Sequence, residues 1–156
     1  EMANMNSPEQ TVLSGRVEAI EAAEKLAKEA GAKRAIRLNV AGAFHSSLMA
    51  SAARRLEETL GPVGFGKPLI PVISNVTGQS HGAPDEIKAL MVRQVTASVQ
   101  WVSCVQTLKG MGVGAYVEAG PGKVLTGLVR RIDKEAVLHN IQDLPSLEQV
   151  AGALSN

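Results

Sequence analysis

The chain has 156 residues, 45% of them hydrophobic and 20% charged, which is typical of a globular domain with its own core. A net charge of +1 without a basic block, together with 3% aromatic residues, argues against a nucleic-acid or anionic-membrane surface. No apolar run reaches the roughly 20 residues that span a bilayer, and the single cysteine, Cys104, excludes an internal disulfide and favours the cytoplasm.

The first part of the chain is expected to form a small α+β layer, because its elements follow the order β, β, α, β. These elements cover residues 3–6, 10–13, 16–30 and 35–38. Position 39 is the plausible boundary between sub-structures. The opening residues lack the basic start and apolar core of a signal peptide, and with no methionine at position 1 they suggest that a preceding portion is missing.

The rest of the chain alternates helices and strands, which is typical of an α/β layer with mainly parallel strands. Helices are predicted over residues 46–60, 86–96, 98–109, 123–132 and from about 146, and strands over 68–74, 115–118 and 136–140.

Three histidines are candidates for chemistry. His45 lies in a small-residue turn, within residues 41–49, that delivers it to a helix start, where it could act as a base or, with Ser46 and Ser47, only help to cap the helix. His81 is expected in water and His139 at a strand end. Their wide spacing and the single cysteine predict no metal site.

Two motifs resemble known sites only superficially. Ser80 stands in Gly-Gln-Ser-His-Gly, the pattern of a nucleophile elbow, but an elbow needs a strand directly before the serine and a helix directly after it. Residues 118–126 resemble a phosphate loop, but the Walker spacing fails. This segment is better interpreted as a strand-to-helix turn, and an anion at the helix start is the weaker reading.

Five motifs in order carry a resemblance to a family. They are Asn4-x-Asn6-Ser-Pro-x-Gln10-x-Val12-x-Ser14-Gly15, Ala43-Phe-His-Ser-Ser-Leu-Met49, Ile73-Ser-Asn-Val-Thr-Gly78, Leu90-Met-Val-Arg-Gln94 and Glu118-Ala-Gly-Pro-Gly-Lys-Val-Leu-Thr-Gly127. Over nearly its whole length the chain resembles the C-terminal half of the malonyl-CoA:acyl-carrier-protein transacylases of bacterial type II fatty acid synthesis. The resemblance implies an α/β-hydrolase-like large domain with an inserted ferredoxin-like subdomain. Residues 1–38 would be the second half of that subdomain, and residues 39–156 the C-terminal portion of the large domain.

The resemblance also implies a ping-pong transfer of malonyl from coenzyme A, through a serine, to the phosphopantetheine thiol of acyl carrier protein, without a cofactor. His45 matches the general base, and Gln94 matches the residue whose backbone carbonyl orients the imidazole. Phe44 matches a position that selects malonyl, and Asn6 a polar position near the acyl pocket. Asn75 is a weaker candidate for supporting the site.

The family's N-terminal oxyanion segment, its elbow serine and its malonyl-binding arginine have no match in the chain. We therefore expect a fragment that is inactive alone, exposes apolar surface and partners the missing N-terminal half. Two alternatives remain open: a serine hydrolase that uses Ser80, and a non-catalytic α/β module that binds a carrier protein.

Overall fold

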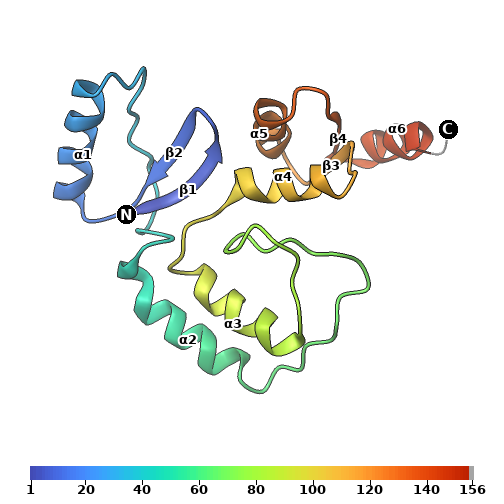
Figure 1. The fold of residues 1–156 in the computed structure, drawn as a ribbon, viewed down its shortest axis with the longest axis horizontal. Helices are drawn as coiled ribbons and strands as arrows, with labels where there is room; N and C mark the ends of the chain where they lie inside the picture. Colours follow the sequence, from blue (N-terminus) through green and yellow to red (C-terminus); the bar gives the residue numbers. More distant parts are fainter. Residues whose placement is uncertain (155–156) are drawn as a thin grey trace.

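The computed structural model describes residues 1–154, which begin with an antiparallel hairpin (Figure 1). β1, Met2–Ser7, pairs with β2, Gln10–Leu13, around the predicted Ser7-Pro8 turn. α1, Val17–Glu29, follows and ends just before Gly31, which takes the left-handed backbone (φ 88°) that suits a helix C-terminus. α1 buries none of its residues and stands at one side of the molecule.

β1 connects the hairpin to the rest of the chain. The Val99 amide donates a hydrogen bond to the Ala3 carbonyl at 2.8 Å, and the Met5 amide donates to the Val99 carbonyl at 2.9 Å. β1 also contacts α4, Trp101–Gly110, and α5, Val124–Ile132. The first 13 residues are thus packed against the C-terminal part of the chain.

Two helices form the lower layer in Figure 1. A short 3₁₀ turn, Ser47–Met49, leads into α2, Ala50–Leu60, which packs against α3, Pro84–Gln94. α3 starts with proline in its first turn, followed by Asp85 and Glu86, as the missing amide and the helix dipole favour. The segment between the helices, residues 61–83, contains only one isolated antiparallel bridge, between Ile73 and Ser80.

The upper layer is a βαβ unit. β3, Ala115–Ala119, and β4, Val137–Ile141, are parallel, and α5 connects them and packs against both. α6, Leu144–Leu154, packs against β4. The hydrophobic core lies under α4 and α5, and its members are Val105, Val129 and Ala136 with the partly buried Trp101, Tyr116, Ile132 and Leu138.

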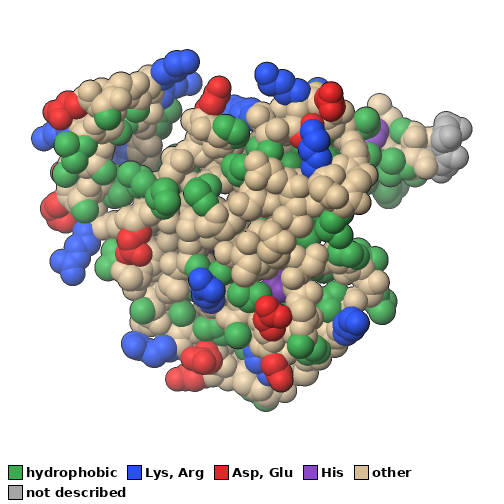
Figure 2. Space-filling model, viewed as in Figure 1, with side chains coloured by type: hydrophobic (Ala, Val, Ile, Leu, Met, Phe, Trp, Pro, Cys, Tyr) green, Lys and Arg blue, Asp and Glu red, His purple; other side chains and the backbone are tan. Residues whose placement is uncertain are grey.

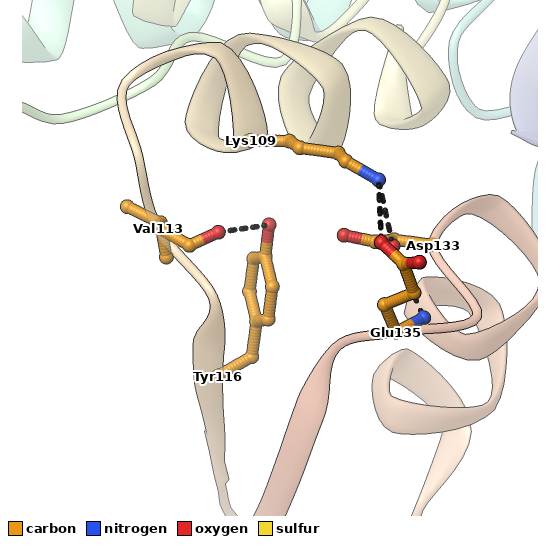
Figure 3. Close-up of polar contacts among 5 residues, drawn as sticks. All are labelled: Lys109, Val113, Tyr116, Asp133 and Glu135. Atoms are coloured by element: carbon orange, nitrogen blue, oxygen red, sulfur yellow. Dashed lines mark hydrogen bonds and ion pairs between the residues drawn. The ribbon is translucent and has the colours of Figure 1, made fainter.

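A polar contact fixes the end of α4 to the end of α5 (Figure 3). Lys109 Nζ lies 2.9 Å from Oδ1 of Asp133, whose side chain is buried, and the same ammonium lies 4.0 Å from Glu135. The hydrogen bond from Lys109 holds the pKa of Asp133 below its usual range. Nearby, the Tyr116 hydroxyl donates to the Val113 carbonyl at 3.5 Å.

The structure confirms the hairpin, the six helices and the two parallel C-terminal strands, and with them a mixed α/β fold. Two predicted strands are wrong, because neither residues 35–38 nor residues 68–74 form a ladder. Both segments are apolar enough for strands, but an extended segment becomes a strand only when a neighbour pairs with its backbone. Ile36 and Leu38 accordingly remain exposed.

Candidate functional site

His45 occupies a constrained turn after α1, just before the 3₁₀ turn that leads into α2. Its φ of 57° makes it the one residue other than glycine with a left-handed backbone among residues 1–154. The His45 amide donates to the Val95 carbonyl at 3.2 Å, and Nδ1 of its half-buried ring lies 2.9 Å from the Gln94 carbonyl oxygen. Gln94 is the last residue of α3, where backbone carbonyls lack a partner within the helix.

This contact determines the tautomer of the neutral ring. A carbonyl oxygen only accepts hydrogen bonds, so the proton of the neutral imidazole must reside on Nδ1. Nε2 then carries the free lone pair and can accept a proton from another group. The arrangement can thus serve as a general base whose orientation is fixed by main chain, although the catalytic role of His45 stays a prediction.

Hydrogen bonds of two serines stabilise the turn that carries His45. The Ser46 hydroxyl is fully buried and donates to the Ala43 carbonyl at 2.6 Å. The Ser47 amide lies 3.1 Å from both carboxylate oxygens of Glu1, and the Ser47 hydroxyl donates to one of them at 2.5 Å. These hydrogen bonds lower the pKa of Glu1.

The expectation that these residues cap the following helix is wrong. Neither the 3₁₀ turn nor α2 has a side-chain cap, because the serine hydroxyls donate to Ala43 and Glu1 and the His45 ring faces Gln94. Sequence reasoning missed Glu1 altogether. It lies 46 residues from Ser47, and no local spacing could have indicated the pair.

Phe44 and Asn6, the predicted acyl-binding residues, lie in the turn before Ser47 and on β1. Phe44 directly precedes His45 and its side chain is half exposed, while Asn6 is a partly buried residue of β1. No hydrogen bond found within residues 1–154 links either side chain to His45. Their part in acyl binding stays a prediction.

Ser80 does not occupy an elbow. It is exposed and forms an antiparallel bridge with Ile73, and α3 begins only at Pro84. The expectation that His81 lies in water is wrong, because Nδ1 of its ring is buried, without a hydrogen-bond partner among the described residues. The His81 amide donates to the Val72 carbonyl at 2.8 Å.

A carboxylate of the chain itself occupies the helix start at residues 118–126. Glu118 accepts hydrogen bonds from the amides of Leu125, at 3.0 Å, and Thr126, at 2.7 Å, and from the Asn140 amide, at 3.1 Å. Hydrogen bonds from Thr126 first, then from Leu125 and Asn140, lower the pKa of Glu118 to about 2. The Glu118 carboxylate therefore occupies the place at the helix start where, in the weaker interpretation, an external anion was expected.

His139, expected at a strand end, lies in the middle of β4.

An open apolar hollow lies beneath α4. Its volume is about 260 Å³, and its lining includes Pro71, Ile73, Trp101, Leu108, Tyr116 and Val129. Asn75 also borders it. Cys104 on its wall has a raised thiol pKa because of burial, so the thiol is protonated and unreactive.

Neither a metal site nor a membrane-spanning helix is found in the described part of the chain. Within residues 1–154, no group of three or more His, Cys, Asp or Glu side chains is arranged to hold a metal ion. None of the helices in this range is both long and apolar enough to cross a membrane.

Comparison with known proteins adds sequence and structural relatives. The chain is 39% identical over 148 residues to the malonyl CoA-acyl carrier protein transacylase of Bacillus subtilis, an alignment that covers 95% of this chain and 47% of the relative. An acyl carrier protein S-malonyltransferase from Vibrio cholerae superimposes with a TM-score of 0.93 and 43% identity, over 96% of this chain and 49% of that one. A malonyl-transacylase in complex with its type II PKS acyl-carrier protein gives a TM-score of 0.94 and 38% identity, over 98% and 50%.

No protein-family model matches the chain. The chain spans about half the length of the curated relatives that it matches. Almost all of this chain, 95% and 96%, lies within those alignments. Its mixed α/β fold is that of the corresponding half of the solved structures. By sequence and by fold, the chain is homologous to about half of a malonyl CoA-acyl carrier protein transacylase.

Proposed function

We propose that this chain supplies the histidine base for the transfer of malonyl from malonyl-CoA to the phosphopantetheine thiol of acyl carrier protein. The observation that carries the proposal is the 2.9 Å contact between His45 Nδ1 and the Gln94 carbonyl, which leaves Nε2 as the basic nitrogen. The homology to transacylases supports the identity of the reaction.

In the first half-reaction, Nε2 of His45 takes the proton of a serine hydroxyl while the serine oxygen attacks the thioester carbonyl of malonyl-CoA. The tetrahedral intermediate collapses, the carbon–sulfur bond breaks, and the imidazolium returns its proton to the coenzyme A thiolate. In the second half-reaction, Nε2 deprotonates the phosphopantetheine thiol. The thiolate attacks the malonyl-serine ester, and the serine oxygen leaves with the proton from His45.

The serine of this mechanism must come from outside the motifs of residues 1–156. Ser80 is remote from an elbow geometry, and the Gly-His-Ser-x-Gly motif of the family has no match here. We infer that residues 1–156 are inactive by themselves and act with the portion of a transacylase that they do not match. In that assembly, residues 1–38 would belong to a ferredoxin-like subdomain and residues 39–156 to an α/β-hydrolase-like domain.

Substrate selection is assigned to residues beside the base. Phe44 directly precedes His45, so its ring would limit the room next to the reacting carbonyl and disfavour an α-methyl group. Asn6, on β1, would offer an amide to the acyl group. Replacing Phe44 by serine is expected to raise the relative rate with methylmalonyl-CoA, measured against malonyl-CoA in the same preparation.

Labelling with radioactive malonyl-CoA tests the proposal. The chain is incubated alone and with the remaining portion of a transacylase relative, and covalent label is counted after denaturation. We expect label only in the mixture, and at least about 100-fold slower labelling with His45→Gln, as for the loss of a general base.

The same assay decides between the alternatives. Label on the isolated chain that disappears with Ser80→Ala would establish the serine hydrolase instead. Absence of label in every mixture, with carrier protein still bound, would establish a non-catalytic binding module.

A further inference from the structure

The turn that carries His45 has a backbone that must be held by contacts from outside the turn. His45 has a φ of 57°, a left-handed conformation that L-residues avoid and that persists only where the surroundings fix it. The chain that leads into the turn has no regular structure, because residues 33–40 form neither helix nor strand. The contacts that hold the turn therefore come from other elements.

One of these contacts comes from Glu1, at the start of the hairpin. Both oxygens of its carboxylate lie 3.1 Å from the Ser47 amide, and the Ser47 hydroxyl donates to one of them at 2.5 Å. Ser47 is the first residue of the 3₁₀ turn that runs into α2, and amides at a helix start lack a partner within the helix. The Glu1 carboxylate thus caps this helix start from a different element, with the charge that the helix dipole favours there.

Glu1 is itself held in place by the hairpin. Its nitrogen donates to the Ser14 carbonyl at 2.9 Å, and its carbonyl accepts from the Ser14 amide at 2.9 Å. In Figure 1 the N-terminus lies beside the turn that leads into α2. Figure 2 shows the acidic side chains of the face drawn there scattered among basic and hydrophobic ones. The influence of Glu1 on the turn therefore comes from its contacts with Ser47 and not from an acidic surface.

The contact between Glu1 and Ser47 closes a circuit of hydrogen bonds around the base. β1, which begins next to Glu1, pairs with Val99 through two backbone hydrogen bonds of 2.8 and 2.9 Å. The segment 94–99 also supplies both carbonyls that face His45, one 3.2 Å from its amide and one 2.9 Å from its ring. The turn is thus connected to one segment by two routes, directly at His45 and through Ser47, Glu1 and β1. Because these attachments are only two residues apart, they restrict how the backbone of His45 can move.

We propose that Glu1 is a positioning residue for the base. Its carboxylate holds the turn at Ser47, and the held turn keeps Nδ1 of His45 on the Gln94 carbonyl and Nε2 directed away from it. Glu1 acts through Ser47 and not on the ring. The effect of Glu1 on the ring requires no substrate chemistry, whereas its effect on the rate of malonyl transfer rests on the proposed function.

Nitrogen NMR of the His45 ring tests this role in the chain alone. At a pH where the ring is neutral, we expect the unsubstituted chain to carry the proton on Nδ1 only. With Glu1→Ala we expect a mixture of both tautomers, because a ring released from the Gln94 carbonyl also protonates on Nε2, the nitrogen that a base must keep free. Urea unfolding followed by Trp101 fluorescence should show a cooperative transition for both chains, so that the ring is compared in folded molecules.

Matched variants locate the effect. Glu9→Ala removes an exposed carboxylate from the same hairpin and should leave the ring protonated on Nδ1 only. Glu1→Gln keeps an oxygen that can accept from the Ser47 amide, so it should restore part of the Nδ1-only signal. Ser47→Ala combined with Glu1→Ala should add little to Glu1→Ala alone, because both substitutions break the same contact.

The labelling assay of the proposed function measures the consequence for transfer. In the mixture with the remaining portion of a transacylase relative, Glu1→Ala should label about 10- to 100-fold more slowly, the range for a catalytic group displaced by up to about 1 Å. Glu9→Ala should label at the full rate.

A His45 ring that stays protonated on Nδ1 only in Glu1→Ala would overturn the inference, and so would an equal change of tautomer in Glu9→Ala. Full-rate labelling by Glu1→Ala would also overturn it and would leave the proposed function standing. A change of tautomer in Glu1→Ala without label in any mixture would establish that Glu1 positions the ring while refuting the proposed function.

Discussion

Replacing Gly78 by alanine should destabilise the chain through two separable effects. Gly78 has a φ of 69°, and a left-handed backbone costs an L-residue about 1–2 kcal/mol. A Cβ at this position would also lie 2.5 Å from the Ser103 Cβ, against the usual 3.5–4.0 Å between carbon atoms. Overpacking of this kind typically costs about 1–3 kcal/mol, so the two effects together should lower the free energy of unfolding by about 2–5 kcal/mol.

The loop that carries Gly78 cannot move far from α4 to relieve this clash, because two contacts hold it there. Moving the loop away from α4 would lengthen the hydrogen bond from the Thr107 hydroxyl to the Gly78 carbonyl, now 2.6 Å, and the contact of Cys104 Sγ with the Ser74 carbonyl. Both contacts hold the loop that borders the hollow under α4. The cost therefore cannot be avoided by a small shift of one side chain.

Urea unfolding followed by Trp101 fluorescence measures the effect, with two glycines as controls. Gly112 has a φ of 87° but open space around it, so Gly112→Ala should cost only the backbone term of about 1–2 kcal/mol. Gly127 lies inside α5 with open space, so Gly127→Ala should stabilise by about 0.5–1 kcal/mol. Equal losses for Gly78→Ala and Gly112→Ala would refute the close approach to Ser103.

Three further predictions concern the core, the helix start and the base. Val105→Ala removes two methyl groups from the most buried apolar side chain, at about 0.8 kcal/mol each plus a cavity term, so urea unfolding should show a loss of about 2–3 kcal/mol. The pKa of Glu118 is about 2 when folded, below its ordinary 4.5, so its stabilisation is present above pH 4.5 and is lost as the pH falls toward 2. Acid unfolding should therefore be steeper in the unsubstituted chain than in Glu118→Gln, and equal slopes would contradict the carboxylate cap. Gln94→Ala keeps the carbonyl that accepts from His45, so nitrogen NMR should find the His45 ring still protonated on Nδ1.

The elements that the sequence predicted correctly are those whose signals are local. Ser7-Pro8 marks the hairpin turn, and the glycines at 120 and 122, with φ of 136° and 94°, permit the turn from β3 toward α5. The strands expected at 35–38 and 68–74 failed for a non-local reason. Their composition favours an extended backbone, but only a neighbouring strand turns an extended segment into part of a sheet.

In the candidate site, too, local signals were predicted correctly and non-local contacts were not. The resemblance placed His45 and the Gln94 carbonyl together, and the structure has them 2.9 Å apart, although their roles are still to be tested. The contact between Glu1 and Ser47 carries no signal in the sequence, because the pairing depends on how β1 docks beside the turn. Burial of His81 Nδ1 escaped prediction because a glycine-rich polar loop normally lies in water.

The contacts of His45 explain how its ring is held in one orientation by the described residues themselves. The ring and amide are fixed by Gln94 and Val95 at the end of α3, and the turn around them is fastened through Ser46 and through Ser47 with Glu1. All of these partners belong to the described residues, and Glu1 and Ser47 are 46 residues apart in the sequence. The orientation of the His45 ring is thus set within residues 1–154, by backbone atoms of α3 on one side and by the turn held through Ser46 and Ser47 on the other.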